Sequence, residues 1–460
     1  MVRFMPPFSP CPSRPTGEAC MERTAIARRA LLGPSGRLLS KVMGLGGRVS
    51  HMLPDAPATV SVHSPHAAPP SRRRPQGTVL LLLADTGGGH RASALAVARE
   101  LVRLPDAPVP HLLDPFTHAA PRPVGWTVGL YSPLIRHLPP LWGALFHASN
   151  SRPALAALRA TAFRLLEPGL EELIDALRPA AVVSFHPLVN HAAARVLRRR
   201  PGTPIPLITV VTDLVDVHSA WICEDADAVV TPSPAALDRI RAAGIDAERC
   251  FDLGLPVDES FTARSATGAE RRRLRRGLGL EPGRRTVLLS GGGEGSGGLL
   301  RRARALCSAG LDIQLVVICG RNTAVRDRLL ALQPEPPTTL HVHGFVPNMA
   351  EWMRASDLMV TKAGPATITE ALCAGVPLLL TSHIPGQERG NVDLVVTVGA
   401  GRHVPGEAAL VDAVAELVRP GSVALLAMRE ALVAASRPEA SAATARLISL
   451  LAARAAVGPR

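Results

Sequence analysis

The sequence contains little that would place this chain inside a membrane or in an oxidising compartment. Its longest uninterrupted apolar runs, such as Val79–Ala84 and Val376–Leu380, are far too short to span a bilayer. No secretory signal pattern opens the chain. The seven cysteines are odd in number, scattered and without a CxxC pair. This distribution favours a reducing compartment and argues against a disulfide framework or a zinc cluster.

Aromatic residues and lysines are scarce as well. Phe, Trp and Tyr make up 3% of the chain, which disfavours a nucleic-acid surface built on stacked rings. Only Lys41 and Lys362 occur, so arginine carries nearly all of the +13 net charge. The first 76 residues hold 11 Lys or Arg against three acidic residues. This basic, Pro/Ser/Arg-rich leader is expected to be disordered, a targeting segment or an arm attracted to anionic lipid.

The remainder has the composition of a folded protein, with 47% hydrophobic and 19% charged residues. Its 460 residues exceed what one hydrophobic core usually serves, so we expect two domains. Short apolar runs alternate with helical stretches such as 92–103, 165–177, 234–243, 298–308, 366–374 and 407–418. This alternation predicts an α/β fold of two doubly wound, Rossmann-like parallel sheets. The expected strands are 78–84, 110–113, 180–185, 207–211, 227–231, 249–253, 286–290, 313–318, 339–343, 357–361 and 376–381.

The predicted domain limits follow from the same pattern. Residues 77–256 form the first domain, and 284–421 form the second. A charged, turn-rich linker is expected over 257–283. Residues 422–460 are predicted to be helical and to pack near the domain junction.

The stretch LLLLADTGGGHRASA, Leu80–Ala94, follows the first predicted strand. Ligands of such sheets bind beyond the carboxyl ends of the strands. Three glycines permit close backbone approach, and the helix start behind them suits an anion. His90 can take a proton near pH 7, and Asp85 can orient it or cap the helix. A structural capping role for His90 is the alternative.

Two further segments offer groups that suit phosphates and hydroxyl groups. The loop LLSGGGEGSGG, Leu288–Gly298, offers free N–H groups to a diphosphate, although a merely flexible loop reads the same way. Glu370, on a helix after Lys362-Ala-Gly-Pro, can accept hydrogen bonds from a ribose diol. A solvated helix face is its alternative. Gln387, Glu388 and Asn391 suit sugar hydroxyls, with helix capping as the alternative.

These segments, with TVVTDLVDVHSAW, SFHPLVNH and FDLGLPV in order between about Thr78 and Val404, resemble monogalactosyldiacylglycerol synthase and its bacterial relatives. Those are inverting glycosyltransferases related to the peptidoglycan-precursor N-acetylglucosaminyltransferase. The resemblance implies a GT-B fold, a nucleotide sugar on the second domain, an acceptor on the first and no obligatory metal. It leaves galactose and glucose as possible sugars. It implies no acceptor preference at Val215–Trp221, where VDVHSAW replaces the STCHPTW of plant members.

The resemblance also implies roles for individual residues. His90, with Asp85, matches the base that acts on the acceptor hydroxyl, and Pro187 matches a loop associated with lipid stimulation. On the acceptor and lipid side we also place Gly88, Gly89, Trp126, Tyr131, Trp142 and Trp221. The donor set comprises the diphosphate loop Gly291, Gly292 and Gly293, the uracil pair Phe345 and Val346, the phosphate turn Thr361, Lys362, Gly364 and Thr367, the ribose ligand Glu370, and the sugar contacts Gln387, Glu388 and Asn391.

We therefore expect a UDP-galactose-dependent transferase that acts on the sn-3 hydroxyl of diacylglycerol in a membrane surface. Four of the 14 aromatics fall within Gly125–Ser149, which suits an interfacial segment or an ordinary core helix pair. A peripheral location is expected, on a bacterial cytoplasmic face or a plastid envelope. The alternatives are a glucosyl or N-acetylhexosaminyl transferase on another lipid, a nucleotide-sugar epimerase, and a basic membrane-surface scaffold.

Overall fold

A computed structural model describes residues 77–84, 88–118, 134, 138–161, 163–263, 266–293, 295 and 297–457. The basic leader therefore lies outside the described residues. Asp85, Trp126 and Tyr131 lie outside them too.

The first lobe is built on a six-stranded parallel sheet with the order β2-β1-β3-β4-β5-β6. Its strands confirm the predicted ones to within a few residues: β1 (Thr78–Leu82), β2 (Val109–Leu113), β3 (Ala181–Ser184), β4 (Leu207–Val210), β5 (Ala228–Thr231) and β6 (Cys250–Asp252). The β1, β3, β4 and β5 runs are almost entirely buried. Both faces of the sheet are covered, which is why these strands are continuously apolar instead of alternating.

The helices of the first lobe begin where sequence signals place them. Pro187 stands in the first turn of α10, and Ser233 caps α11 by accepting a hydrogen bond from the N–H of Ala236. The described helices of this lobe are α3 (Gly89–Arg103), α4 (Pro115–His118), α7 (Pro139–Ser149), α8 (Arg152–Ala160), α9 (Glu167–Leu177), α10 (Pro187–Arg199) and α11 (Pro234–Ala242), with the one-turn helices η1 (Arg164–Leu166), η2 (Ser219–Trp221) and η3 (Ala247–Arg249).

The second lobe contains the other parallel sheet, with the order β12-β11-β10-β7-β8-β9. The predicted strands are found as β7 (Thr286–Ser290), β8 (Gln314–Ile318), β9 (Thr339–His343), β10 (Leu358–Lys362) and β11 (Leu378–Ser382). A further strand, β12 (Gly401–His403), was not predicted. It is three residues long and contains an Arg and a His, so it carries no apolar run for the sequence to signal.

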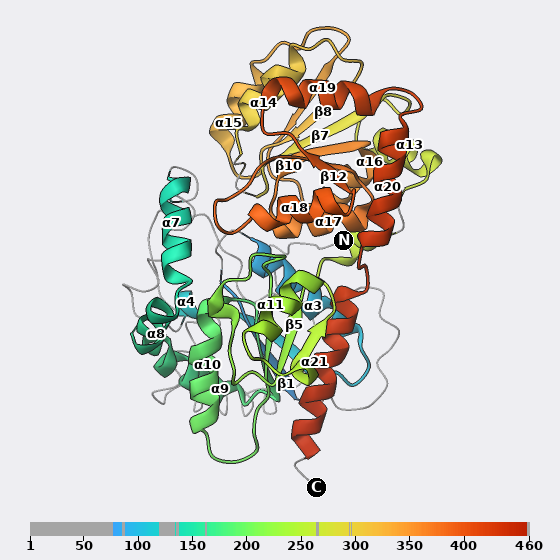
Figure 1. Ribbon diagram of the computed structural model, residues 1–460. Helices are drawn as coiled ribbons and strands as arrows, with labels where there is room; N and C mark the ends of the chain where they lie inside the picture. Colours follow the sequence, from blue (N-terminus) through green and yellow to red (C-terminus); the bar gives the residue numbers. More distant parts are fainter. Residues whose placement is uncertain are drawn as a thin grey trace, which may run out of the picture. The chain divides into compact units, whose positions relative to one another are not determined.

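Helices cover both faces of the second sheet (Figure 1). Val287, Leu289 and Val317 face α14 and α19, whereas Leu288 and Val316 on the other face belong to the core that includes α16, α17 and α18. The remaining helices are α12 (Glu259–Thr262), α13 (Gly268–Gly277), α14 (Leu299–Cys307), α15 (Thr323–Leu330), α16 (Met349–Ala355), α17 (Pro365–Ala374), α18 (Arg389–Thr397), α19 (Glu407–Val418), α20 (Val423–Ala435) and α21 (Ala440–Val457).

The stretch predicted as a linker, 257–283, contains two helices. Thr267 caps α13, and Arg275 is buried against the Asp357 carboxylate at a distance of 2.6 Å. The charged run RRRLRR is therefore a packed helix, because a buried carboxylate neutralises part of its charge.

The C-terminal segment is helical but divided. The chain breaks between α20 and α21 near Pro438, where a helix interior would lose a hydrogen bond. Leu432 of α20 belongs to the core of the second lobe, whereas Ile448 of α21 joins α3 in the core of the first. The two helices thus connect the lobes.

The order of each sheet has one switch point. In the first sheet the chain passes from β1 to β2 on one side and to β3 on the other. In the second sheet the switch lies between β7 and β10. His90 lies in the first turn of the helix after β1, and His186 follows β3. Gly291–Gly293 follow β7, and Lys362 is the last residue of β10. Ligands of doubly wound sheets bind at such points.

Candidate active site

His90 lies in the first turn of α3, directly after Gly88. Gly88 has a φ of 84°, a left-handed conformation that favours glycine. A side chain added at Gly89 would lie 3.8 Å from Cβ of Ala366, which belongs to α17 of the second lobe. Ser93 Oγ donates to the carbonyl oxygen of Pro256 at 2.9 Å. The Gly-Gly-His turn therefore lies beside the second lobe, as a site shared by both lobes requires.

The imidazole of His90 is held by several neighbours. Its Nδ1 lies 2.9 Å from the hydroxyl of Thr212, and its ring centroid is 4.8 Å from that of His186 and 6.2 Å from that of Trp221. Burial lowers the pKa of His90 to about 4, although a hydrogen bond with the backbone of Phe185 opposes the shift. At neutral pH the ring is therefore uncharged, which is the form that can accept a proton.

The turn after β4 belongs to the stretch TVVTDLVDVHSAW, but Thr212 and Asp213 in this turn were not predicted as site residues. Thr212 contacts the His90 ring, and the next residue, Asp213, accepts a hydrogen bond from the indole N–H of Trp221 at 2.8 Å. Asp213 also forms a hydrogen bond with the side chain of Gln387, from the second lobe. Burial raises the pKa of Asp213 to about 6. The signal that could have found this pair is its position at the carboxyl end of a buried parallel strand.

The glycine loop after β7 forms tight backbone contacts. Gly292 has a φ of 72°, and a side chain there would approach Cε of Lys362 at 4.0 Å. The carbonyl oxygen of Gly293 accepts a hydrogen bond from the N–H of Arg321 at 3.0 Å. Gly291 is buried and Gly293 is exposed. The structure thus brings the predicted diphosphate loop next to Lys362, across the switch point.

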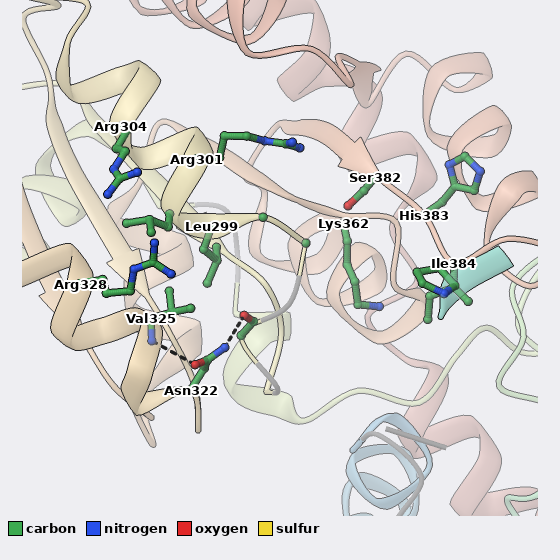
Figure 2. A pocket seen from close by; sticks show the side chains of 15 residues that line it. Leu299, Arg301, Arg304, Asn322, Val325, Arg328, Lys362, Ser382, His383 and Ile384 are labelled. Carbon is green, nitrogen blue, oxygen red and sulfur yellow. Dashed lines mark hydrogen bonds between the residues drawn. The ribbon is translucent and has the colours of Figure 1, made fainter. Parts of the chain in front are cut away.

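A cavity of about 670 Å³ opens beside this loop (Figure 2). Lys362, Ser382 and His383 line one side of the view, and Arg301, Arg304 and Arg328 lie on the other. Asn322 stands between them, donating to the carbonyl oxygen of Gly295 at 3.2 Å and accepting from the N–H of Val325 at 3.1 Å. The three arginines were not predicted as site residues, because arginines are spread throughout this sequence.

Cations and glycine backbone in one cavity suit a phosphate-bearing ligand. Gly298 precedes α14 without a side-chain cap, and Gly298, Leu299 and Leu300 of this helix start line the same cavity. Arg301 also pairs with Glu407 at 2.5 Å, which offsets part of its charge. Among the residues that the structure describes, four arginine and lysine side chains line this cavity and no acidic side chain does. The cavity can therefore hold two phosphates.

Lys362 has an explicit partner in the turn after β11. Its Nζ lies 2.7 Å from Oε1 of Glu388, whose other oxygen accepts from the N–H of Ile384 at 2.9 Å. A Cβ at Gly364 would stand 2.8 Å from Nζ, so a larger residue there would displace the ammonium group from this position. Glu388 is buried. The carboxylate thus fixes both the lysine and the turn that carries Gln387.

The other predicted donor residues fall into two groups. Phe345 is 65% exposed beside the Arg321 guanidinium, and Thr367 and Glu370 are half-buried on α17. Burial raises the pKa of Glu370 to about 8, with a smaller effect from Asp258. The second group is packed within the lobe: Val346 packs against the hydrophobic core, Thr361 is buried within β10, and Asn391 is buried with its amide donating to the carbonyl oxygen of Ala363 at 2.9 Å.

The predicted acceptor side is only partly described. Pro187 begins α10 after β3, and Trp142 is half-buried on α7. Trp221 differs from its predicted lipid contact, because its indole is wholly buried and bonded to Asp213. Asp85, Trp126 and Tyr131 lie outside the described residues.

Two larger features are absent from the described parts of the chain. Among those residues no helix is long and apolar enough to cross a membrane. The same residues bring together no three His, Cys, Asp or Glu side chains that could hold a metal ion.

Two parallel sheets, each with a glycine-containing loop at its switch point, define a GT-B-like protein. Solved structures show the same fold. The enzyme MurG of Acinetobacter baumannii aligns over 81% of this chain and 99% of its own, with a TM-score of 0.54 and 18% identity. A UDP-GlcNAc 2-epimerase of Neisseria meningitidis aligns over 80% and 99%, with a TM-score of 0.50 and 12% identity. The fold alone therefore does not separate a transferase from an epimerase.

The sequence comparisons make that separation. Residues 90–257 match the family described as Monogalactosyldiacylglycerol (MGDG) synthase, and residues 286–444 match the Glycosyltransferase family 28 C-terminal domain. Monogalactosyldiacylglycerol synthase 1, chloroplastic, of Arabidopsis thaliana is 34% identical over 371 residues, covering 79% of this chain and 68% of its own. A probable monogalactosyldiacylglycerol synthase 3 of Oryza sativa subsp. japonica is 35% identical over 375 residues, covering 79% and 72%. The chain belongs to the monogalactosyldiacylglycerol synthase family of glycosyltransferases.

Proposed function

We propose that this protein transfers galactose from UDP-galactose to the sn-3 hydroxyl of 1,2-diacylglycerol, with inversion at the anomeric carbon. Family membership supports the donor and the acceptor. The observation that carries the mechanism is the pair Thr212 and Asp213. One residue of this pair contacts the predicted base His90, and the next contacts the predicted sugar ligand Gln387. Base and donor sugar would thus meet at one point.

In the proposed reaction the acceptor oxygen attacks the anomeric carbon while His90 removes its proton. The bond from that carbon to the diphosphate breaks, and UDP leaves with the electron pair. A neutral imidazole can accept the proton directly. Because burial lowers the pKa of His90 to about 4, its basicity is modest. Proton removal is then expected to accompany bond formation instead of preceding it.

Charge on the leaving diphosphate would be stabilised by the cavity beside the glycine loop. Lys362, Arg301 and Arg328 supply positive charge there, and the start of α14 supplies N–H groups. This set offers cationic and amide stabilisation without a bound ion. We therefore propose that the enzyme needs no metal. Closure of the two lobes around the donor would keep water from acting as the acceptor.

A lipid acceptor requires contact with a membrane surface. Leu138, Leu141 and Leu145 are 53%, 48% and 46% exposed. Leu138 directly precedes α7, and the spacing of the three leucines places them on one face of the helix. We propose that this face enters the interface and that the protein is peripheral, on a bacterial cytoplasmic face or a plastid envelope. Anionic lipid would add attraction for the basic leader.

Two alternative activities would use parts of the same site or the same fold. A glucosyl or N-acetylhexosaminyl transferase acting on another lipid would use the same base and the same cavity. An epimerase would share the fold, as the Neisseria meningitidis structure shows. An epimerase acts without an acceptor, so exposed leucines on α7 and a base held by the first lobe favour transfer.

An assay with diacylglycerol-containing vesicles tests the proposal. Purified protein is incubated separately with UDP-galactose and UDP-glucose, and the lipid products are separated by thin-layer chromatography. The proposal predicts galactosyldiacylglycerol as the preferred product. Preferred glucosyl transfer would refute the sugar assignment. Isomerised UDP-sugar without any glycolipid would refute transfer.

A further inference from the structure

The carboxylate of Asp213 lies between the two lobes and is surrounded by hydrogen-bond donors. Its Oδ2 accepts from the indole N–H of Trp221 at 2.8 Å and from the backbone N–H of His218 at 3.4 Å. The residue is only 6% exposed. Such a buried carboxylate keeps its position because several donors satisfy it.

The third contact of Asp213 is the side chain of Gln387. This contact favours the ionised form of the carboxylate, so the glutamine donates to it. An ionised carboxylate only accepts hydrogen bonds, whereas a glutamine amide has one donating and one accepting end. The NH₂ of Gln387 is therefore the end that faces Asp213. Its carbonyl oxygen is the other end of the amide and has two lone pairs with which to accept hydrogen bonds.

The same turn of the first lobe also holds the backbone next to Gln387. Oδ2 of Asp216 accepts from the N–H of Gly390 at 2.7 Å, in the first turn of α18. A Cβ at Gly390 would come within 2.5 Å of Val215, so the two segments touch there without a gap. This contact fixes where α18 begins, and with it the position of the Gln387 backbone.

We propose that Asp213 is a positioning residue for the donor sugar. It orients the Gln387 amide so that the carbonyl oxygen accepts a hydrogen bond from a hydroxyl of the transferred hexose, while Asp216 anchors the turn. The inference rests on the proposed function and adds the residue that sets the polarity of the sugar contact. It also assigns part of the donor site to the acceptor lobe.

The polarity can be reversed and then restored by substitution. In Asp213→Asn the new amide group can donate toward Gln387, which would then turn its oxygen inward and present NH₂ to the sugar. In Gln387→Glu two carboxylates would face one another. In the double variant Asp213→Asn/Gln387→Glu, the amide at position 213 donates to the carboxylate at 387, whose other oxygen again accepts from the sugar.

The readouts are kcat and KM for UDP-galactose, and the dissociation constants of UDP-galactose and of UDP alone. Each single variant is expected to lower kcat/KM by about 10- to 100-fold, because the hydrogen bond to the sugar hydroxyl is lost and a buried polar group is left without its partner. UDP lacks the sugar, so its affinity should stay within about threefold of wild type. The double variant should recover to within about fivefold of wild type. Asp238→Asn, at an exposed position on α11, is the matched control and should change neither quantity.

Each outcome either supports or refutes the positioning role of Asp213. Recovery in the double variant, with unchanged UDP affinity, supports the positioning role. Single variants that match wild type, losses that simply multiply in the double variant, or an equal loss of UDP affinity would overturn it. If Asp213→Asn fails to fold, Gln387→Glu alone must still weaken UDP-galactose without weakening UDP. If wild type binds UDP-galactose but forms no galactolipid, the proposed function fails, while the binding data still test Asp213 independently.

Discussion

His90 shows how burial selects the protonation state of a single residue. Thr212 and the Phe185 backbone hold its ring, and desolvation lowers its pKa to about 4. If the imidazole is the base, activity depends on the neutral form, which is complete well below neutral pH. The acidic limb of kcat/KM is therefore expected nearer pH 4 than the ordinary histidine value of about 6.5.

Substitution of His90 should separate catalysis from donor binding. His90→Ala is expected to lower kcat by about 10²- to 10⁴-fold, which is the usual contribution of a general base. Transfer to diacylglycerol vesicles and calorimetric titration with UDP measure the two effects. Because the cavity beside α14 is untouched, UDP affinity should be retained. A comparable loss of UDP affinity would show that His90 supports the fold or the donor instead.

Glu370 illustrates the opposite effect of burial on an acid. Its pKa is raised to about 8, above the value near 4.3 of an unfolded chain. The folded state therefore binds the proton more tightly, and its stability is lost as the pH rises from about 5 to 8. Glu370→Gln removes this titration. The Tm of the variant relative to wild type should rise between pH 5 and pH 9, as measured by thermal unfolding.

An exposed glutamate on a helix provides the control for that measurement. Glu430 is exposed on α20, so Glu430→Gln should leave the difference in Tm independent of pH. A difference for Glu370→Gln that is equally flat would show that the carboxyl group of Glu370 is not desolvated.

At the level of elements, the start of α18 depends on a glycine. Cβ of an alanine at position 390 would stand 2.5 Å from Val215 and 3.1 Å from the Asp216 carboxylate. Gly390→Ala must therefore push the two lobes apart locally, at an overpacking cost of about 1–3 kcal/mol. We expect a lower Tm and a higher KM for UDP-galactose. Gly277→Ala, which meets nothing within 4 Å, should be near neutral in both assays.

Helix α7 makes a second element-scale prediction. Its leucines are exposed, whereas Gly143 on the same helix packs against Pro385 of the second lobe. Replacing Leu141 and Leu145 by serine should weaken sedimentation with diacylglycerol vesicles severalfold, because about 0.8 kcal/mol is lost per buried CH₂. Leu330→Ser, at a 60% exposed position on α15, is the control. Equal vesicle binding by both variants would place the membrane contact elsewhere.

For the whole molecule, the fold could be predicted because buried parallel strands are continuous apolar runs. Leu80–Ala84 and Val287–Leu289 carry this signal strongly, and both sheets follow from it. Short elements that contain polar residues were not predicted, and β12, with Arg402 and His403, is an example. The division between α20 and α21 was missed because a single proline interrupts an otherwise helical sequence.

The site was predicted less completely, for a different physical reason. Lys362 ends β10 and His90 lies in the first turn of the helix after β1, so topology alone places them at switch points. Asp213 also follows a strand, but its partners Trp221 and Gln387 lie at very different sequence separations. The second of these comes from the other lobe. Contacts between lobes have no local signature in a sequence, so their partners become visible only in the folded chain.

We propose that a base from the first lobe and a UDP-sugar site from the second meet at one point between the lobes. The anomeric configuration of the lipid product tests it most directly, because a single displacement must invert the α linkage of UDP-galactose. Proton NMR of the purified glycolipid from wild type should show only β-galactosyldiacylglycerol, and His90→Ala should form almost none while still binding UDP. An α-linked product would refute the single displacement, and an undiminished amount of product from His90→Ala would refute the role of His90 as the base.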